Sequence, residues 1–190
     1  MEVARQLLLG GADIEEQGGG FYPSTPLQIA LQQDKVEIVK LLLEHGADVS
    51  VIDVGDGGST LHLAASKWRA TLRGHEAVAL LIQHGADVSS KNESGWTALH
   101  RAAHHGDVEI VRVLLQYGAN VLAETNSGET AEYWATLKAH HQVVAMLQAE
   151  AVTRAKCVAF AMSHQQRLGA GSQVARFDPE LLRMVLAYVE

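Results

Sequence analysis

The spacing of apolar and polar positions over residues 95–121 predicts two short helices. The first segment has a face of small apolar side chains, formed by Leu99, Ala102 and Ala103. Thr97 stands where its hydroxyl can cap that helix. A more strongly apolar segment follows, in which Leu114 is predicted to be buried between repeats. Gly118 ends this segment as a residue that adopts positive φ without a Cβ clash. Two helices of this size cannot bury their apolar faces alone, so the unit requires neighbours.

The same unit recurs along the chain. Hydroxyl residues that can cap a first helix occupy the matching positions Thr25, Ser59, Thr97 and Thr130, at intervals of 34, 38 and 33 residues. The second helices end in Gly-Ala-Asp or Gly-Ala-Asn at residues 11–13, 46–48, 85–87 and 118–120. Because several positions recur together, the chain is predicted to be a stack of repeats.

The repeats resemble the ankyrin repeat. The residues that carry this resemblance are Thr25-Pro26-Leu27-Gln28, Ser59-Thr60-Leu61-His62 and Thr97-Ala98-Leu99-His100, each followed by a Gly-Ala-Asp or Gly-Ala-Asn. The resemblance implies an all-α solenoid of helix-turn-helix repeats joined by β-hairpin-like turns. It places a partial repeat at residues 1–24 and full repeats from residues 25, 59, 97 and 130, within a repeat domain of residues 1–150. Glu132 replaces the leucine of the other copies, as suits a terminal repeat whose outer face meets water.

The second repeat contains an insertion between Ala65 and Gly74, centred on residues 68–72. An insertion at this corner either lengthens the first helix or forms a loop. Trp68 and Leu72 are four residues apart, so both side chains could cover the side of the stack; the alternative is a secondary contact site.

Residues 151–190 are predicted to form a C-terminal helical extension. The helical pattern of the fourth repeat continues through residue 162 and breaks at residues 168–172. A final segment, residues 178–189, begins with Asp178 as N-cap and Pro179 at the first helical position, and carries an apolar stripe. We expect this segment to fold back as a cap. The alternative is that it resembles the opening helix of an F-box, which implies a substrate adaptor whose partner is the adaptor subunit of a cullin-type ubiquitin ligase.

The net charge of −7 is unevenly distributed. Residues 1–150 carry 10 Lys and Arg against 19 Asp and Glu, whereas residues 151–190 carry 5 against 3. An acidic repeat surface repels nucleic acid and suits a basic or neutral protein partner, although the acids could also serve only solubility. No apolar run approaches the ~20 residues of a membrane-spanning helix. We therefore expect no nucleic-acid or membrane partner, and a cytoplasmic location with the nucleus as the alternative.

The sequence predicts neither catalysis nor metal binding. Cys157 lies in an apolar run, which predicts a buried, inert thiol in a reducing compartment. The ankyrin resemblance implies that His62 and His100 tie neighbouring turns together by hydrogen bonds. His104 and His105 are adjacent, so their side chains point about 100° apart on a helix and chelate poorly. We predict no metal, no cofactor and no enzymatic activity.

Binding of a protein partner is the predicted function. In proteins that this chain resembles, the turns and the exposed side of the first helices form a concave binding surface. Carried over position by position, the predicted binding residues are Lys91, Glu93, Trp96, Arg101, His104, His105, Asn126, Glu129, Trp134 and Lys138. Phe21 and Tyr22 are predicted to join them, because the first loop lies on the same edge of the repeats. Neighbouring Trp and Arg side chains are typical of binding hot spots. The alternatives are that Trp96 folds back over its own turn and that Trp134 plugs the cap. The prediction is a non-catalytic protein–protein interaction module.

Overall fold

The computed structural model describes residue 6 and residues 9–18, 23–53, 55–66 and 73–168, with backbone alone over residues 160–168. The chain divides into two compact units, residues 1–144 and 145–190. The described helices are α2 (Pro26–Gln32), α3 (Val36–Glu44), α4 (Thr60–Ala64), α5 (Gly74–Gln83), α6 (Ala98–His105), α7 (Val108–Gln116), α8 (Ala131–Leu137) and α9 (His141–Leu168). Predicted contacts that involve residues 19–22, 67–72 and 169–190 lie outside the described residues.

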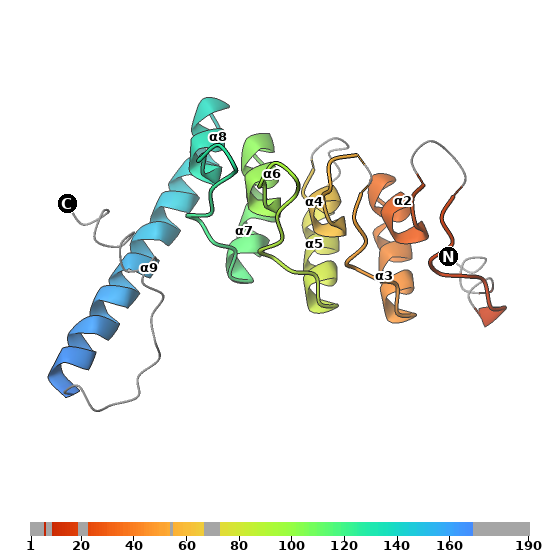
Figure 1. Cartoon of the computed structure of the whole chain (residues 1–190), viewed down its shortest axis with the longest axis horizontal. Coiled ribbons are helices and arrows are strands. Elements are labelled where there is room, and N and C mark those ends of the chain that lie inside the picture. The colour runs from red at the N-terminus through yellow and green to blue at the C-terminus, as the bar shows by residue number, and fades with distance from the viewer. Residues whose placement is uncertain (1–5, 7–8, 19–22, 54, 67–72, 169–190) are drawn as a thin grey trace. The chain divides into compact units, whose positions relative to one another are not determined.

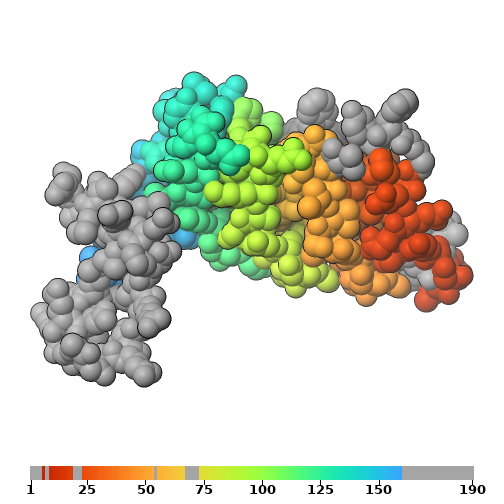
Figure 2. All heavy atoms as spheres, viewed as in Figure 1, coloured from red at the N-terminus to blue at the C-terminus, as the bar shows by residue number. Residues whose placement is uncertain are grey.

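The helices of the first unit form an all-α stack of repeats. The first helices of the repeats, α2, α4, α6 and α8, follow one another in a row, and the second helices α3, α5 and α7 form another row (Figure 1). In the space-filling view the atoms of successive repeats pack together in chain order (Figure 2). The turns carry isolated antiparallel bridges, Ile52 with Ser59 and Glu124 with Thr130, and the described residues contain no longer strand.

Each first helix begins at the predicted hydroxyl residue. Thr25, Ser59, Thr97 and Thr130 are the N-caps of α2, α4, α6 and α8. The second helices of repeats end before glycines with positive φ, and Gly118 (φ 85°) has open space where a Cβ would lie. A side chain there would meet no steric obstacle, so the backbone conformation alone explains the glycine.

The core lies between the two rows of helices. Leu61, Leu81, Leu99 and Leu114 are each at most 1% exposed, so the prediction that Leu114 is buried is confirmed. Small residues complete the packing of the first helices, because Ala98, Ala102, Ala103 and Ala135 have no exposed surface. Stacking of adjacent first helices therefore depends on small side chains.

Helix α4 is the shortest of the first helices. It ends at Ala64, with Ala65 as C-cap, whereas α6 continues to His105. The insertion predicted in this repeat therefore does not extend the first helix through Ala65. The predicted packing of Trp68 against Leu72 lies outside the described residues.

Helix α9 continues without interruption to Leu168, as the pattern predicted. The prediction of a buried Cys157 is wrong, because this thiol is exposed. Ala151 and Val158 lie seven residues apart on one buried stripe of α9. Cys157 precedes Val158 directly, and adjacent helical residues point about 100° apart, so an apolar neighbourhood in sequence did not place the thiol on that stripe. Within the described ranges, no helix has the length and apolar character that crossing a bilayer requires.

Candidate protein-interaction surface

His62 ties the second repeat to the turn of the third. The backbone N–H of Ser59 donates to His62 Nδ1 (3.2 Å), so the remaining ring proton is on Nε2. Nε2 donates to the carbonyl of Trp96 at 2.8 Å. One imidazole thus caps its own helix and positions Trp96, 34 residues further along the chain.

His100 repeats this arrangement one repeat later. The backbone N–H of Thr97 donates to His100 Nδ1 (3.1 Å), and Nε2 donates to the carbonyl of Glu129 (3.1 Å). His62 and His100 are 1% or less exposed, and burial lowers the pKa of each imidazole below its ordinary value of 6.5. Both histidines are therefore neutral connectors between repeats, in the role that the resemblance implied.

Gln28 occupies the same position in the first repeat but makes only half of this arrangement. Its Oε1 accepts the backbone N–H of Thr25 at 2.9 Å, as the histidine Nδ1 does in the other repeats. The Nε2 group is buried and has no hydrogen-bond partner. The first repeat thus lacks the forward hydrogen bond that positions the following turn.

The turns of the third and fourth repeats are also joined directly. Asn126 donates through Nδ2 to the carbonyl of Glu93 (2.8 Å) and through its backbone N–H to the carbonyl of Ser94 (3.1 Å). Lys91 Nζ donates to the carbonyl of Glu124 (2.7 Å). Gly95 has φ 78°, and a Cβ there would lie 2.6 Å from the backbone nitrogen of Asn126. Close approach and backbone conformation together require glycine at this position.

Trp96, His104, His105 and Trp134 form an aromatic cluster across the third and fourth repeats. The ring centroids of Trp96 and Trp134 are 4.8 Å apart, and the ring of His104 lies 5.6 Å from each of them. His105 packs edge-on against His104 at 5.0 Å. These separations fall in the range in which aromatic rings attract one another, and all four side chains remain partly exposed.

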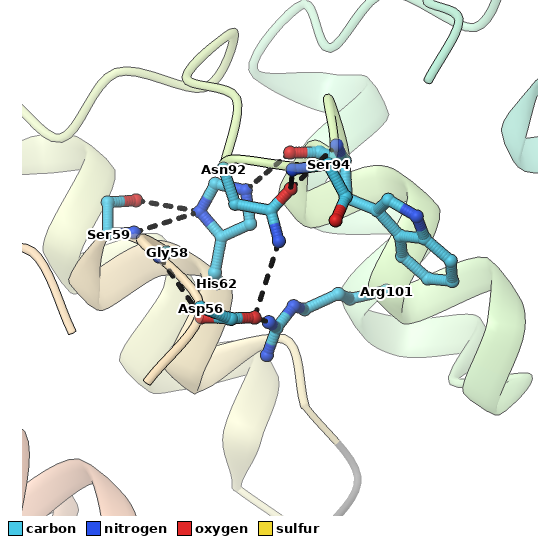
Figure 3. A network of polar contacts seen from close by, with 8 residues as sticks. Asp56, Gly58, Ser59, His62, Asn92, Ser94 and Arg101 are labelled. Carbon is cyan, nitrogen blue, oxygen red and sulfur yellow. Dashed lines mark hydrogen bonds and ion pairs between the residues drawn. The ribbon is translucent and has the colours of Figure 1, made fainter. Parts of the chain in front are cut away.

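A polar network borders this cluster (Figure 3). Arg101 forms an ion pair with Asp56 from the turn of the preceding repeat. Asp56 also accepts hydrogen bonds from the backbone N–H of Gly58 (3.1 Å) and from Asn92 Nδ2 (3.3 Å). Asn92 Oδ1 in turn accepts the backbone N–H groups of Ser94 (3.1 Å) and Trp96 (2.8 Å). The network connects the turn of the second repeat to that of the third.

A hollow of about 390 Å³ lies between the polar network and the aromatic cluster. Its lining residues are Asp56, Asn92, Ser94, Trp96, Arg101, His104 and His105. Burial lowers the pKa of His104 below its ordinary value, and the positive charge of Lys138 and the nearby His140 lower it further. The His104 ring is therefore neutral at pH 7, and the hollow combines aromatic surface with one carboxylate and one guanidinium.

The predicted binding residues have different positions in this arrangement. Trp96, Arg101, His104 and His105 meet at the hollow, and Trp134 contacts Trp96 from α8. Lys91, Glu93 and Asn126 lie on the exposed turns, and Lys138 lies at the end of α8. Both polar groups of Glu129 already have partners. Its carboxylate accepts a hydrogen bond from the Thr125 hydroxyl, and its backbone carbonyl accepts one from Nε2–H of His100. Phe21 and Tyr22 lie outside the described residues.

The sequence did not predict Asp56, Asn92, Tyr133 or Leu137 as part of this surface. Asp56 and Asn92 build the polar network, and Tyr133 and Leu137 are 50% and 59% exposed on α8. The repeat alignment contained a signal for Leu137, because it corresponds to His104 in the preceding repeat. No local pattern marks Asp56, whose partner lies 45 residues further along the chain. Across the described residues, no three His, Cys, Asp or Glu side chains lie together as metal ligands do.

Comparisons with known proteins agree with this architecture. A family model described as ankyrin repeats (3 copies) matches residues 1–92 and 67–157. Palmitoyltransferase AKR1 of Lachancea kluyveri is 36% identical over 147 residues, which are 77% of this chain and 20% of that protein. Human palmitoyltransferase ZDHHC13 is 41% identical over 64 residues, 34% of this chain and 10% of that protein. Human ankyrin repeat and SOCS box protein 5 is 51% identical over 45 residues, 24% of this chain and 13% of that protein.

These relatives are much longer than the matched segments, since the chain spans at most 20% of each of these three. Their names therefore describe whole proteins of which the similarity covers a small part. The family model, in contrast, covers most of this chain. The chain belongs to the ankyrin-repeat family and is a repeat module of the kind that binds proteins.

Proposed function

We propose that this chain binds a partner protein, without catalysis, through the turns and first helices of its third and fourth repeats. The observation that carries the proposal is the aromatic cluster of Trp96, His104, His105 and Trp134, which stays partly exposed beside a hollow. Trp and Tyr dominate the residues whose truncation weakens protein interfaces most. Tyr133 and Leu137 extend the exposed apolar surface along α8.

The frame of this surface supports tight binding because it is already ordered. His62 and His100 hold the two turns, and Asn126 joins them. A preformed surface loses less conformational entropy on association than one that must order itself. Arg101 contributes less as an independent anchor, since Asp56 already pairs with its guanidinium.

The test is capture of a partner by the full chain from a cell lysate, followed by calorimetry with the purified partner. Trp96→Ala and Leu137→Ala should each weaken binding by ~1–4 kcal/mol. Tyr117→Ala is the matched control, because this tyrosine is 40% exposed at the end of α7 in the row of second helices. Equal losses with Tyr117→Ala, or no loss with the first two variants, would contradict the proposal.

A second candidate function is that of a substrate adaptor of a cullin-type ubiquitin ligase. It is favoured by the similarity of these repeats to a protein whose name joins ankyrin repeats to a SOCS box. The segment that resembles the opening helix of an F-box, residues 178–189, lies outside the described residues. Co-purification of the full chain with the adaptor subunit of the ligase, lost when residues 169–190 are deleted, would support this candidate; absence of co-purification would reject it.

A further inference from the structure

The hollow beside Trp96 has an aromatic wall and an acidic rim. We propose that it receives a positively charged side chain, arginine or lysine, of the bound partner. This inference rests on the proposed function, because it assigns a partner chemistry to part of the same surface. Its basis is the space, the charge and the ring placement at the boundary of the second and third repeats.

The second repeat has a glycine at the position where the third has Trp96. Gly58 precedes the N-cap Ser59 in the same way that Trp96 precedes Thr97. A Cβ at Gly58 would lie 2.9 Å from Asp56 Oδ1 and 3.0 Å from the Cβ of His62. A side chain at this position would crowd the Asp56 carboxylate, so the glycine allows Asp56 to keep its place in the wall of the hollow.

The charge around the hollow is negative. Arg101 is the only permanent cation among the described lining residues, and Asp56 pairs with it. Two further carboxylates lie near the hollow, although their residues do not line it. Asp53 acts electrostatically on Arg101, and the Glu93 side chain lies over Gly57, where a Cβ would be 2.7 Å from Glu93 Cγ. Lys91 donates to the turn of the fourth repeat and does not line the hollow. Lys138 acts electrostatically on His104, so the three carboxylates exceed the two nearby cations, Arg101 and Lys138, by one.

The aromatic wall favours the same kind of ligand. Trp96 lines the hollow and is partly exposed, and the indole ring attracts cations most strongly among aromatic side chains. His104 is neutral at pH 7 because burial lowers its pKa, so it adds no repulsion. A guanidinium or ammonium group in the hollow would therefore meet the Trp96 ring and the Asp56 carboxylate, and the Glu93 side chain lies on the turn beside Asp56.

Other side chains fit less well. A carboxylate would face three acidic groups, Asp53, Asp56 and Glu93, against the two positive charges of Arg101 and Lys138. A large apolar side chain would cover the Asp56–Arg101 ion pair and remove it from water without a new partner, which is unfavourable. Charge complementarity therefore selects a cationic side chain.

The experiment uses four short peptides and the full chain. Their sequence is acetyl-Gly-Ser-X-Ser-Gly-amide, where X is arginine, lysine, citrulline or glutamate. Binding is followed by NMR through the indole N–H signal of Trp96, assigned with Trp96→Phe. The arginine and lysine peptides should shift this signal in a saturable way. Citrulline has nearly the shape of arginine without its charge, and its peptide should bind roughly 2- to 30-fold more weakly.

A pair of variants locates the bound charge. Glu93→Gln should weaken binding of the arginine peptide about two- to fivefold, as expected for an exposed ion pair. Glu109→Gln removes an exposed carboxylate on α7 and should leave this affinity unchanged. Equal affinity for the citrulline and arginine peptides, preference for the glutamate peptide, or an unchanged affinity in Glu93→Gln would overturn the inference.

The peptide experiment and the partner-capture experiment can fail independently of each other. Partner capture that depends on Trp96 and Leu137, without a charge preference among the peptides, would reject the cation site and leave the binding function standing. A charge preference among the peptides, without any partner captured through Trp96 and Leu137, would reject the binding function instead.

Discussion

The boundary between the first and second repeats differs from that between the third and fourth at equivalent positions. His100 donates across the later boundary to the carbonyl of Glu129, whereas the Nε2 group of Gln28 is buried at the earlier boundary without a partner. Four positions after the N-cap, the first repeat has Ile29 and the fourth has Trp134. Both boundaries have the same arrangement of helices. The earlier boundary lacks the hydrogen bond to the following turn, and the later boundary carries the aromatic cluster.

This difference separates two kinds of residue in a stack of repeats. Leucine, alanine and the forward-bonding histidine hold adjacent repeats together, so their effects belong to stability. Trp96, Trp134 and Leu137 keep exposed surface, so we expect their substitution to affect binding of the proposed partner. Substitutions in these two classes of residue should therefore separate effects on stability from effects on binding.

The largest effect on stability is expected for Leu114→Ala. Leu114 is completely buried, so its truncation removes apolar contacts and leaves a cavity that lowers the free energy of unfolding by ~2–5 kcal/mol. Leu137→Ala makes the same chemical change at a side chain that is 59% exposed and should change stability by less than about 0.5 kcal/mol. Urea denaturation followed by circular dichroism measures both, and similar losses would show that the division into frame and surface is wrong.

The second prediction concerns a variant, His100→Gln, that gives the third repeat the residue found at the same position of the first repeat, Gln28. His100→Gln retains an acceptor for the backbone of Thr97 but should lose the donor to the carbonyl of Glu129, as Gln28 does in its own repeat. Leaving one buried polar group without a partner should lower the free energy of unfolding by about 1–3 kcal/mol. An unchanged denaturation midpoint would indicate that the forward hydrogen bond adds nothing to the stack.

The third prediction concerns the dependence of the free energy of unfolding on pH. Burial lowers the folded-state pKa of His62 and His100, so between the ordinary pKa of 6.5 and the lower folded value the unfolded chain binds more protons. Stability is therefore greatest above about pH 6.5 and falls as the pH decreases, by at most ~1.4 kcal/mol per pH unit for each histidine. His104, whose pKa is also lowered, adds to this slope.

Denaturation curves between pH 7.5 and pH 5 would measure this slope. The double variant His62→Gln, His100→Gln should have a shallower dependence than the natural sequence. A natural chain that becomes more stable on acidification through this range would contradict the neutral, forward-bonding state of the two imidazoles.

The smallest expected effect is a gain in stability. Gln28→His should give the first repeat a donor for the carbonyl of Gly58, which corresponds to the Trp96 and Glu129 carbonyls of the later boundaries. One additional buried hydrogen bond should raise the free energy of unfolding by about 0.5–1.5 kcal/mol. Thermal denaturation of Gln28→His and the natural chain would show the gain, and a lower melting temperature would mean that this boundary cannot place the imidazole.

Local patterns predicted the frame. The four N-caps, the ends of the second helices and the continuous α9 depend on residues a few positions apart, so the sequence contains them. The burial of Leu114 followed from the same helical spacing. The exposure of Cys157 did not follow from the sequence. Packing decides which stripe of α9 is buried, and the run of apolar residues around Cys157 does not reveal it.

The proposed binding surface could be predicted only in part. Position in the repeat pointed to Trp96, His104 and Trp134 as exposed residues, yet the alternatives considered each tryptophan alone, and in the structure their rings contact one another. The Asp56–Arg101 pair joins residues of two repeats, and no local spacing signals it. Contacts between repeats depend on how the stack brings the turns together, which the sequence pattern of one repeat does not contain.

Hydrogen–deuterium exchange of the full chain, with and without its captured partner, would locate the surface that the partner covers. We expect slower exchange over residues 90–105 and 124–138, which contain the turns and first helices of the third and fourth repeats, and unchanged exchange over α5 and α7. Protection of α5 and α7, with residues 90–105 and 124–138 unchanged, would contradict the proposed binding surface.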